Sequence, residues 1–193
     1  TIDDLRWLGL DWDYGPDIGD GTVDTLPVTQ SLRMGRYREV LAGLIRDQKV
    51  YRCTCTRSQI AEAAASAPHE AGLSQLEGPV YPGTCRHKID DTCRAFHFSD
   101  SDSAALRWAF VEGQQSWCDE VLGLQQANPA KQLGDYVIGR ANGQPSYQLA
   151  VVVDDHDMGI TEVVRGDDLV VSTYRQLAIL QHLNWPEPKY FHV

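Results

Sequence analysis

The sequence lacks a long apolar run and a signal peptide, and it has few cysteines. Each of these observations argues against a class of protein. No apolar run approaches the roughly 20 residues that a membrane-spanning helix needs. The opening stretch, TIDDLRWLGLDWD, has neither the basic region nor the apolar core of a signal peptide. Cysteines number only five, an odd count with uneven spacing, which argues against a disulfide framework and favours metal binding or burial. We therefore expect a cytoplasmic protein with no membrane contact.

Basic residues are also scarce, because 17 lysines and arginines face 27 aspartates and glutamates, for a net charge of −10. Phosphate contacts need Lys and Arg, so a nucleic-acid partner must meet a local basic patch. What is present is ordinary for a globular chain: 193 residues, 42% hydrophobic and 23% charged. This length predicts one good core and a smaller appended unit.

Two apolar runs each end in a cluster of charges. Residues 150–153, AVVV, predict a buried strand that stops at the acidic run 154–157, DDHD. Residues 161–164 repeat the pattern and stop at 165–168, RGDD. In an open α/β sheet, ligands bind beyond the carboxyl ends of the strands, so these charges are candidate site residues.

The rest of the chain predicts further elements around these two runs. Helices are expected at 2–9, 31–49, 61–73 (with a loop near Pro68) and 172–183, and strands at 50–51, 95–98, 106–111, 120–124 and 190–193, with a hairpin joining 135–140 to 148–153. In the second helix the buried face is Tyr37, Val40, Leu41, Leu44 and Ile45, and Ser172 or Thr173 caps the last helix. This order indicates a parallel α/β layer with an inserted, more antiparallel portion that carries cysteines. Because the chain stops on a strand, we expect it to be an internal piece of a longer protein.

The cysteines suggest a zinc site. Cys53 and Cys55 form one half, and Tyr81 and Cys85 supply a second half after a loop. Zinc prefers four tetrahedral ligands, and three thiolates fit it well. The fourth ligand is open at this point between Tyr81 and His87, and three buried free thiols are the alternative to a metal. The remaining cysteines, Cys93 and Cys118, are expected in the core.

The charged ends of the two runs have ordinary alternatives. The acidic run 154–157 can cap a helix N-terminus, which we favour over a metal site because four consecutive residues rarely all face one ion. Arg165 either forms a surface ion pair or binds a substrate carboxylate with its planar guanidinium. Tyr147 at the start of its run is ordinarily a core residue. Physical reasoning does not choose between these alternatives.

Five stretches carry a family likeness: QSLRMGRYREVL at 30–41, CTCTRSQI at 53–60, YQLAVVVDDHDMGITEVVRGDDL at 147–169, STYRQLAIL at 172–180 and NWPEPKYFHV at 184–193. Together they resemble the catalytic domain of class I glutamyl-tRNA synthetases. They are most similar to the short paralogues, the glutamyl-Q tRNA(Asp) synthetases. This chain has RGDDLVVST and YQLA where the long enzymes tend to have RGEEHLSST and YNFA.

The resemblance implies a fold and a metal site. The fold is a Rossmann-type nucleotide-binding domain split by an insertion, so that residues 1–50 end its first half, 51–134 form a zinc-bearing subdomain and 135–193 form its second half. In the short paralogues a C-x-C pair and a Tyr and a Cys four apart hold Zn²⁺. Cys53, Cys55, Tyr81 and Cys85 match that pattern, which favours Tyr81 over His87, although the loop between the pairs is longer here than is common.

The resemblance also implies substrate contacts. Tyr147 and Arg165 match positions that bind L-glutamate, and Asp168 falls near the expected ATP ribose. The acidic run 154–157 becomes a family signature with a capping role. ATP with Mg²⁺ is the expected co-substrate, and no catalytic side chain is identified. HIGH-like and KMSKS-like elements are missing, so the chain is expected to be the middle of the enzyme and inactive alone.

For the intact protein, the resemblance implies formation of glutamyl adenylate and transfer of the glutamyl group to queuosine at the wobble position of tRNA(Asp). The expected partners are therefore L-glutamate, ATP and queuosine-bearing tRNA(Asp), bound by a monomer. One alternative is a glutamyl-tRNA synthetase domain that charges tRNA(Glu). The other is a non-catalytic, zinc-stabilised binding module of the same fold.

Overall fold

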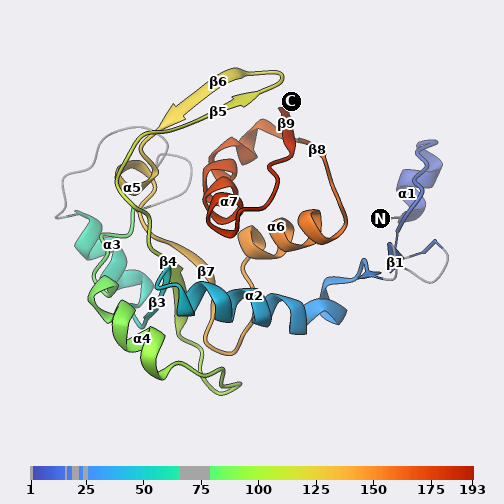
Figure 1. Cartoon of the computed structure of the whole chain (residues 1–193). Helices are drawn as coiled ribbons and strands as arrows, with labels where there is room; N and C mark the ends of the chain where they lie inside the picture. The colour runs from blue at the N-terminus through green and yellow to red at the C-terminus, as the bar shows by residue number, and fades with distance from the viewer. Residues whose placement is uncertain (1, 16, 19–21, 24–25, 66–78) are drawn as a thin grey trace.

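The computed structural model describes residues 2–15, 17–18, 22–23, 26–65 and 79–193 (Figure 1). In chain order its elements are α1 (Ile2–Trp7), β1 (Thr22–Val23), β2 (Leu26–Pro27), the 3-10 helix η1 (Gln30–Arg33), α2 (Met34–Arg46), β3 (Val50–Cys53), α3 (Arg57–Ala65), η3 (Arg86–Lys88), α4 (Ile89–Ala95), β4 (Ala105–Trp108), β5 (Gln115–Asp119), β6 (Gly123–Ala127), α5 (Pro129–Gln132), β7 (Tyr136–Arg140), α6 (Tyr147–Asp157), β8 (Glu162–Arg165), η4 (Asp167–Leu169), α7 (Val170–Leu183) and β9 (Lys189–His192). No helix among these residues is both long and apolar enough to cross a bilayer.

A four-stranded sheet has the order β6-β5-β9-β8. Strands β5, β9 and β8 run parallel, and β6 joins the edge as the antiparallel arm of a hairpin with β5. In Figure 1 this hairpin extends across the top of the molecule. The register pairs Arg165 with His192, so β8 and β9 reach their carboxyl ends together.

A second sheet has three antiparallel strands in the order β3-β4-β7. Buried side chains on one face, including Leu106 and Ile138, belong to the main core together with α2, α6 and α7. Tyr51 and Cys53 from β3 belong instead to a second, smaller cluster with Tyr81. The buried side chains of the described residues therefore form two separate apolar clusters, and the smaller one contains the cysteines of the expected metal site.

Several sequence predictions are confirmed. Helix α2 buries the five predicted side chains, Tyr37, Val40, Leu41, Leu44 and Ile45, because they recur on one face of a 3.6-residue period. Strands β3, β7, β8 and β9 and helix α7 also lie where the pattern places them. Gly9 has a φ of +79° just after α1, a left-handed conformation that suits glycine. Part of the predicted segment 61–73 lies outside the described residues.

The predicted strand 148–153 is wrong, because these residues belong to helix α6. Four buried side chains at i, i+1, i+3 and i+4, namely Leu149, Ala150, Val152 and Val153, pack against the core with helical rather than alternating spacing. Gly159, at a φ of +68°, follows the end of this helix. No hairpin therefore joins residues 135–140 to 148–153, and Tyr147 begins a helix.

Other predicted boundaries are also wrong. Residues 95–98 form the end of α4 and an irregular segment, and 120–124 hold the turn between β5 and β6 and the start of β6. Helix α7 begins at Val170, so Ser172 and Thr173 lie inside it and are buried rather than acting as the cap. Of the two cysteines expected in the core, Cys93 is partly exposed and Cys118 is exposed.

Candidate functional site

Arg165 ends β8 at the carboxyl edge of the parallel strands, as the sequence indicated. Its Nε donates to His192 Nε2 at 3.0 Å, and its Nη2 donates to Thr173 Oγ1 at 2.7 Å. The guanidinium carbon lies 5.1 Å from the ring centre of Tyr190. The side chain is therefore held on one edge and one face, and it is not paired with a neighbouring carboxylate in the described residues.

His192 connects Arg165 to a buried carboxylate on β5. His192 Nδ1 lies 2.6 Å from Asp119 Oδ2, and both side chains are fully buried. Burial tends to raise the pKa of Asp119, but hydrogen bonds from His192 and from the amides of Leu122 and Val121 outweigh it and bring the pKa to about 2. At neutral pH an ionised carboxylate therefore contacts the imidazole that accepts from Arg165.

Two residues of α6 lie on the same side of the molecule as Arg165. Tyr147 begins α6, and Asp155 lies near its C-terminal end. Both act electrostatically on Tyr190, as Arg165 does; burial is the main reason that the pKa of Tyr190 is raised. Tyr147 is half exposed, at 51%, so its ring is open to a ligand rather than packed in the core.

Asp168 lies in η4 directly after this strand end, and it is exposed. Its carboxylate folds back over Gly166, where a Cβ atom added to the glycine would come within 2.5 Å of Asp168 Oδ1. A side chain at position 166 would therefore push the carboxylate aside. Arg165 and Asp168 thus lie in one short segment, and Tyr147 begins the helix that precedes this segment in the chain.

The acidic run 154–157 does not cap a helix N-terminus, because it forms the C-terminal end of α6. Arg33 forms ion pairs with Asp154 at 2.7 Å and with Asp157 at 2.8 Å, and its side chain is only 3% exposed. Arg36 donates to both oxygens of Asp157. The run therefore fastens α6 to the start of α2, and the predicted capping role is wrong.

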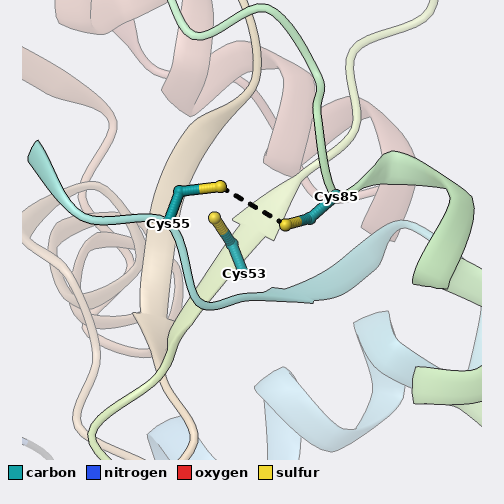
Figure 2. A group of neighbouring side chains, drawn as sticks. All are labelled: Cys53, Cys55 and Cys85. Carbon is teal, nitrogen blue, oxygen red and sulfur yellow. Dashed lines mark hydrogen bonds between the residues drawn. The ribbon is translucent and has the colours of Figure 1, made fainter. Parts of the chain in front are cut away.

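The cysteine cluster lies on the outer side of the three-stranded sheet. The sulfurs of Cys53, Cys55 and Cys85 all lie within 4.8 Å of one another. Figure 2 shows the three side chains converging, with Cys55 and Cys85 joined by a contact of 3.5 Å. Tyr81 Oη completes the group at 3.4 Å from Cys53 Sγ and 3.7 Å from Cys55 Sγ. His87 instead contacts the carbonyl of Thr84 and is exposed.

The protonation of this cluster is uneven. Burial tends to raise the pKa of Cys85, but the Tyr81 hydroxyl and the backbone amide of Thr54 overcome it and bring the pKa to about 7. Burial raises the pKa of the Cys55 thiol, and it raises the pKa of Tyr81 strongly. Cys85 therefore presents a thiolate more readily than Cys55 does.

The cluster fits a tetrahedral zinc ion. With Zn–S bonds of about 2.3 Å, sulfur atoms around a tetrahedral ion lie about 3.8 Å apart. The separation of 3.5 Å between Cys55 and Cys85 is close to that value. Tyr81 Oη also accepts a hydrogen bond from the Cys85 amide at 2.9 Å, which orients its oxygen beside the sulfurs. Three sulfurs and the Tyr81 oxygen thus lie close together.

Sequence reasoning missed Asp119 and His192. The pattern placed a strand at 120–124, one residue beyond Asp119, so this carboxylate was not recognised as a strand end. His192 stood in a strand that was predicted correctly, but its contact with β5 depends on strand order. The signal that identified Arg165, an apolar run ending in a charge, was not available for Asp119, because β5 reads QSWCD.

The architecture agrees with that of known enzymes. A glutamate tRNA ligase from Elizabethkingia meningosepticum, crystallised with its amino acid, superposes with a TM-score of 0.72 at 19% identity; the match covers 100% of this chain and 38% of that one. A glutamate-tRNA synthetase from Elizabethkingia anophelis gives a TM-score of 0.70 with the same coverage. The fold is therefore that of the catalytic domain of a class I aminoacyl-tRNA synthetase.

Sequence comparison also identifies the family within that class. The family model for "tRNA synthetases class I (E and Q), catalytic domain" matches residues 1–193, and the chain belongs to this family. It is 45% identical, over its whole length, to a glutamyl-Q tRNA(Asp) synthetase of Symbiobacterium thermophilum and covers 57% of that protein. A glutamate–tRNA ligase of Magnetococcus marinus is 36% identical, with 36% of its length covered. The chain thus spans about half the length of the glutamyl-Q relatives it matches.

Proposed function

We propose that the whole protein activates L-glutamate with ATP and transfers the glutamyl group to queuosine in tRNA(Asp). The observation that carries this proposal is the identity of 39–45% to several glutamyl-Q tRNA(Asp) synthetases over nearly all of the chain. In the first step a glutamate carboxylate oxygen attacks the α-phosphorus of ATP, and the bond to pyrophosphate breaks. In the second step a hydroxyl of queuosine takes the acyl group and AMP leaves.

In this proposal Arg165 binds a glutamate carboxylate and Tyr147 orients the amino acid. Arg165 Nη1 makes no hydrogen bond within the described residues, while Nε and Nη2 are held by His192 and Thr173. Its two N–H groups are therefore available to a carboxylate. The exposed ring of Tyr147 supports a role in substrate binding. The chemistry depends on positioning and charge rather than on an acid or base from this chain.

The exposed carboxylate of Asp168 is proposed to lie near the ribose of ATP, which binds with Mg²⁺. Its place directly beyond the carboxyl end of β8 supports this assignment, since nucleotides bind at that edge in related α/β sheets. The HIGH-like and KMSKS-like elements expected of these enzymes are not found in this sequence. The complete activity is therefore proposed for the whole protein.

Cys53, Cys55, Tyr81 and Cys85 are proposed to hold one Zn²⁺. The ion, when bound, supplies a structural cross-link between β3 and the segment before η3. The close approach of four donors supports the proposal. We further propose that residues 51–134 form the insertion between two halves of a nucleotide-binding domain, at 1–50 and 135–193. Strands β5 and β6 of that segment pair with the sheet of the second half.

The second candidate is a glutamyl-tRNA synthetase that charges tRNA(Glu). Relatives named glutamate–tRNA ligase, at 33–36% identity over nearly the whole chain, favour this alternative. Both candidates share the activation of glutamate and differ in the acceptor. The distinction therefore rests on the tRNA.

The test is glutamylation by the whole protein with radiolabelled glutamate and three acceptors: tRNA(Asp) with queuosine, tRNA(Asp) without it, and tRNA(Glu). We expect label only on the first. Labelling of tRNA(Glu) alone supports the second candidate. No label on any acceptor, together with no glutamate-dependent pyrophosphate exchange, contradicts both and leaves the non-catalytic module as the explanation.

A further inference from the structure

We propose that Asp119 and His192 are positioning residues that fix the guanidinium of Arg165 through the choice of the His192 tautomer. The inference rests on the proposed function, in which Arg165 binds glutamate. Neither residue is assigned to touch a substrate. Both act through Arg165. A continuous chain of hydrogen bonds links Asp119 to His192 and His192 to Arg165.

The path crosses three adjacent parallel strands at their carboxyl ends. Asp119 ends β5, His192 ends β9 and Arg165 ends β8, and the strand order is β5-β9-β8. The two connecting distances are 2.6 Å from Asp119 Oδ2 to His192 Nδ1 and 3.0 Å from His192 Nε2 to Arg165 Nε. Each strand thus contributes one member, and the rigid sheet sets their spacing.

Asp119 is itself fixed before it orients the imidazole. Its Oδ1 accepts hydrogen bonds from the amides of Val121 at 2.9 Å and Leu122 at 2.8 Å, in the turn after β5. The amide of His192 also approaches this oxygen at 3.4 Å. Oδ2 is left to face the ring. Since an ionised carboxylate can only accept, His192 must carry its proton on Nδ1.

This tautomer decides what Arg165 can do. With the proton on Nδ1, the neutral ring presents a lone pair on Nε2, and Arg165 Nε can donate to it. A proton on Nε2 would instead place two donors against each other at 3.0 Å. Thr173 Oγ1 accepts from Nη2 at 2.7 Å, so two acceptors hold one edge of the guanidinium. Nη1 then faces away from both with its two donors.

The simpler alternative is a buried polar network that only stabilises the core. Asp119→Asn separates the two roles. The variant keeps the size of the side chain and an oxygen for the amides of Val121 and Leu122, but it presents an NH₂ group to His192 Nδ1. The ring must then accept at Nδ1 and carry its proton on Nε2, which opposes the Arg165 donor. A stabilising role alone predicts no selective effect on glutamate.

The experiment measures glutamate-dependent pyrophosphate exchange by the whole protein. For Asp119→Asn we expect the KM for glutamate to rise by about 10-fold or more, by analogy with the outer partners that orient metal-binding histidines, with the KM for ATP unchanged. Asp102→Asn is the matched control, since this carboxylate pairs with Arg52 away from the site. His192→Gln, which can offer an amide oxygen to Arg165, should retain more activity than His192→Leu.

A second readout does not depend on activity. Nitrogen-15 NMR of the histidine rings should show the His192 proton on Nδ1 in the wild type and on Nε2 in Asp119→Asn. A wild-type proton on Nε2 overturns the inference, whatever the enzyme does. An unchanged KM for glutamate despite the swapped tautomer also overturns it, as does an equal rise in the KM for both substrates. If the wild type shows no glutamate-dependent exchange, the proposed function fails, and the ring tautomer still decides whether Asp119 sets the Arg165 contact.

Discussion

At the scale of one residue, Asp155 carries an unusual carboxyl group beside the candidate site. Burial raises the pKa of its carboxyl to about 6, Asp154 adds to the rise, and Arg165 opposes it. No hydrogen bond to its carboxylate is found in the described part of the chain, so the ionised form is poorly compensated. Under the proposed function, the ammonium group of glutamate is a cation of the right sign to compensate it.

The raised pKa predicts a pH dependence of stability. An unfolded Asp titrates near pH 4, so between about pH 4 and pH 6 the folded chain holds a proton that the unfolded chain has lost. Stability therefore falls as pH rises through this window. Asp155→Asn removes the effect, and we expect it to raise the free energy of unfolding by on the order of 1 kcal/mol above pH 6, after allowing for solvent screening.

Urea denaturation of the variant and the wild type at pH 4 and pH 8 measures this difference. The gain should be present at pH 8 and absent at pH 4. Asp100→Asn is the control, because the Asp100 side chain is 91% exposed beside Arg38. A gain for Asp155→Asn that is equal at the two pH values would contradict the assignment.

At the scale of elements, the contact between α2 and α6 depends on Arg33. Its buried guanidinium neutralises Asp154 and Asp157, at opposite ends of the acidic run. Arg33→Met leaves Asp157 paired with Arg36 but leaves Asp154 with neutral donors, the Gln30 amide and the Tyr37 hydroxyl. Removing one partner of a buried ion pair costs about 3 kcal/mol or more, and we expect a loss of that order in the free energy of unfolding.

Chemical denaturation of Arg33→Met measures this loss. Glu112→Gln is the matched control, since its ion pair with Lys131 is exposed and should contribute less than about 1 kcal/mol. Adding Asp154→Asn and Asp157→Asn to Arg33→Met should recover part of the stability. If Arg33→Met were no more damaging than the control, the ion pairs would not hold the two helices together.

Helix α6 shows a limit of prediction from sequence. The AVVV run is rich in β-branched residues and therefore predicted a strand, yet Leu149, Ala150, Val152 and Val153 are buried on a helix. What decides the matter is the environment on several sides, with α2 and α7 packed against α6. By contrast, α2 was predicted in detail because its single buried face leaves a clear period in the sequence.

At the scale of the whole molecule, the two apolar clusters predict a limited response to metal removal. The smaller cluster holds Tyr51, Cys53, Tyr81 and Cys85, while α7 and Tyr190 belong to the main core. We expect one zinc per chain by native mass spectrometry. Chelation should increase amide hydrogen exchange at 51–55 and 81–88, and leave β8, β9 and α7 nearly unchanged.

Cys85→Ser should lose the zinc and reproduce this exchange pattern, and Cys118→Ser should do neither, since Cys118 is exposed and distant from the cluster in sequence. Zinc-free, folded wild-type protein would contradict the metal assignment. Exchange that increased equally in α7 would show that the two clusters are not independent.

Only the part of the candidate site that leaves a local sequence pattern was predictable. Cys53 and Cys55 are neighbours in sequence, and Arg165 ends a recognisable apolar run, so local patterns revealed them. The link from Asp119 through His192 to Arg165 requires the order β5-β9-β8. Strand order is a property of the folded chain and has no local signature in the sequence.

The central place of β9 also has a consequence for how the chain folds. Strand β9 follows β5 and β8 in sequence but lies between them, so neither can join the parallel sheet until residues 189–192 have been synthesised. The β5-β6 hairpin can form early from local contacts, whereas closure of the sheet brings together distant segments and is expected to be slow. A nascent chain that stalls before Lys189 leaves open the edges of β5 and β8 that β9 would cover, and exposes them to association with other chains.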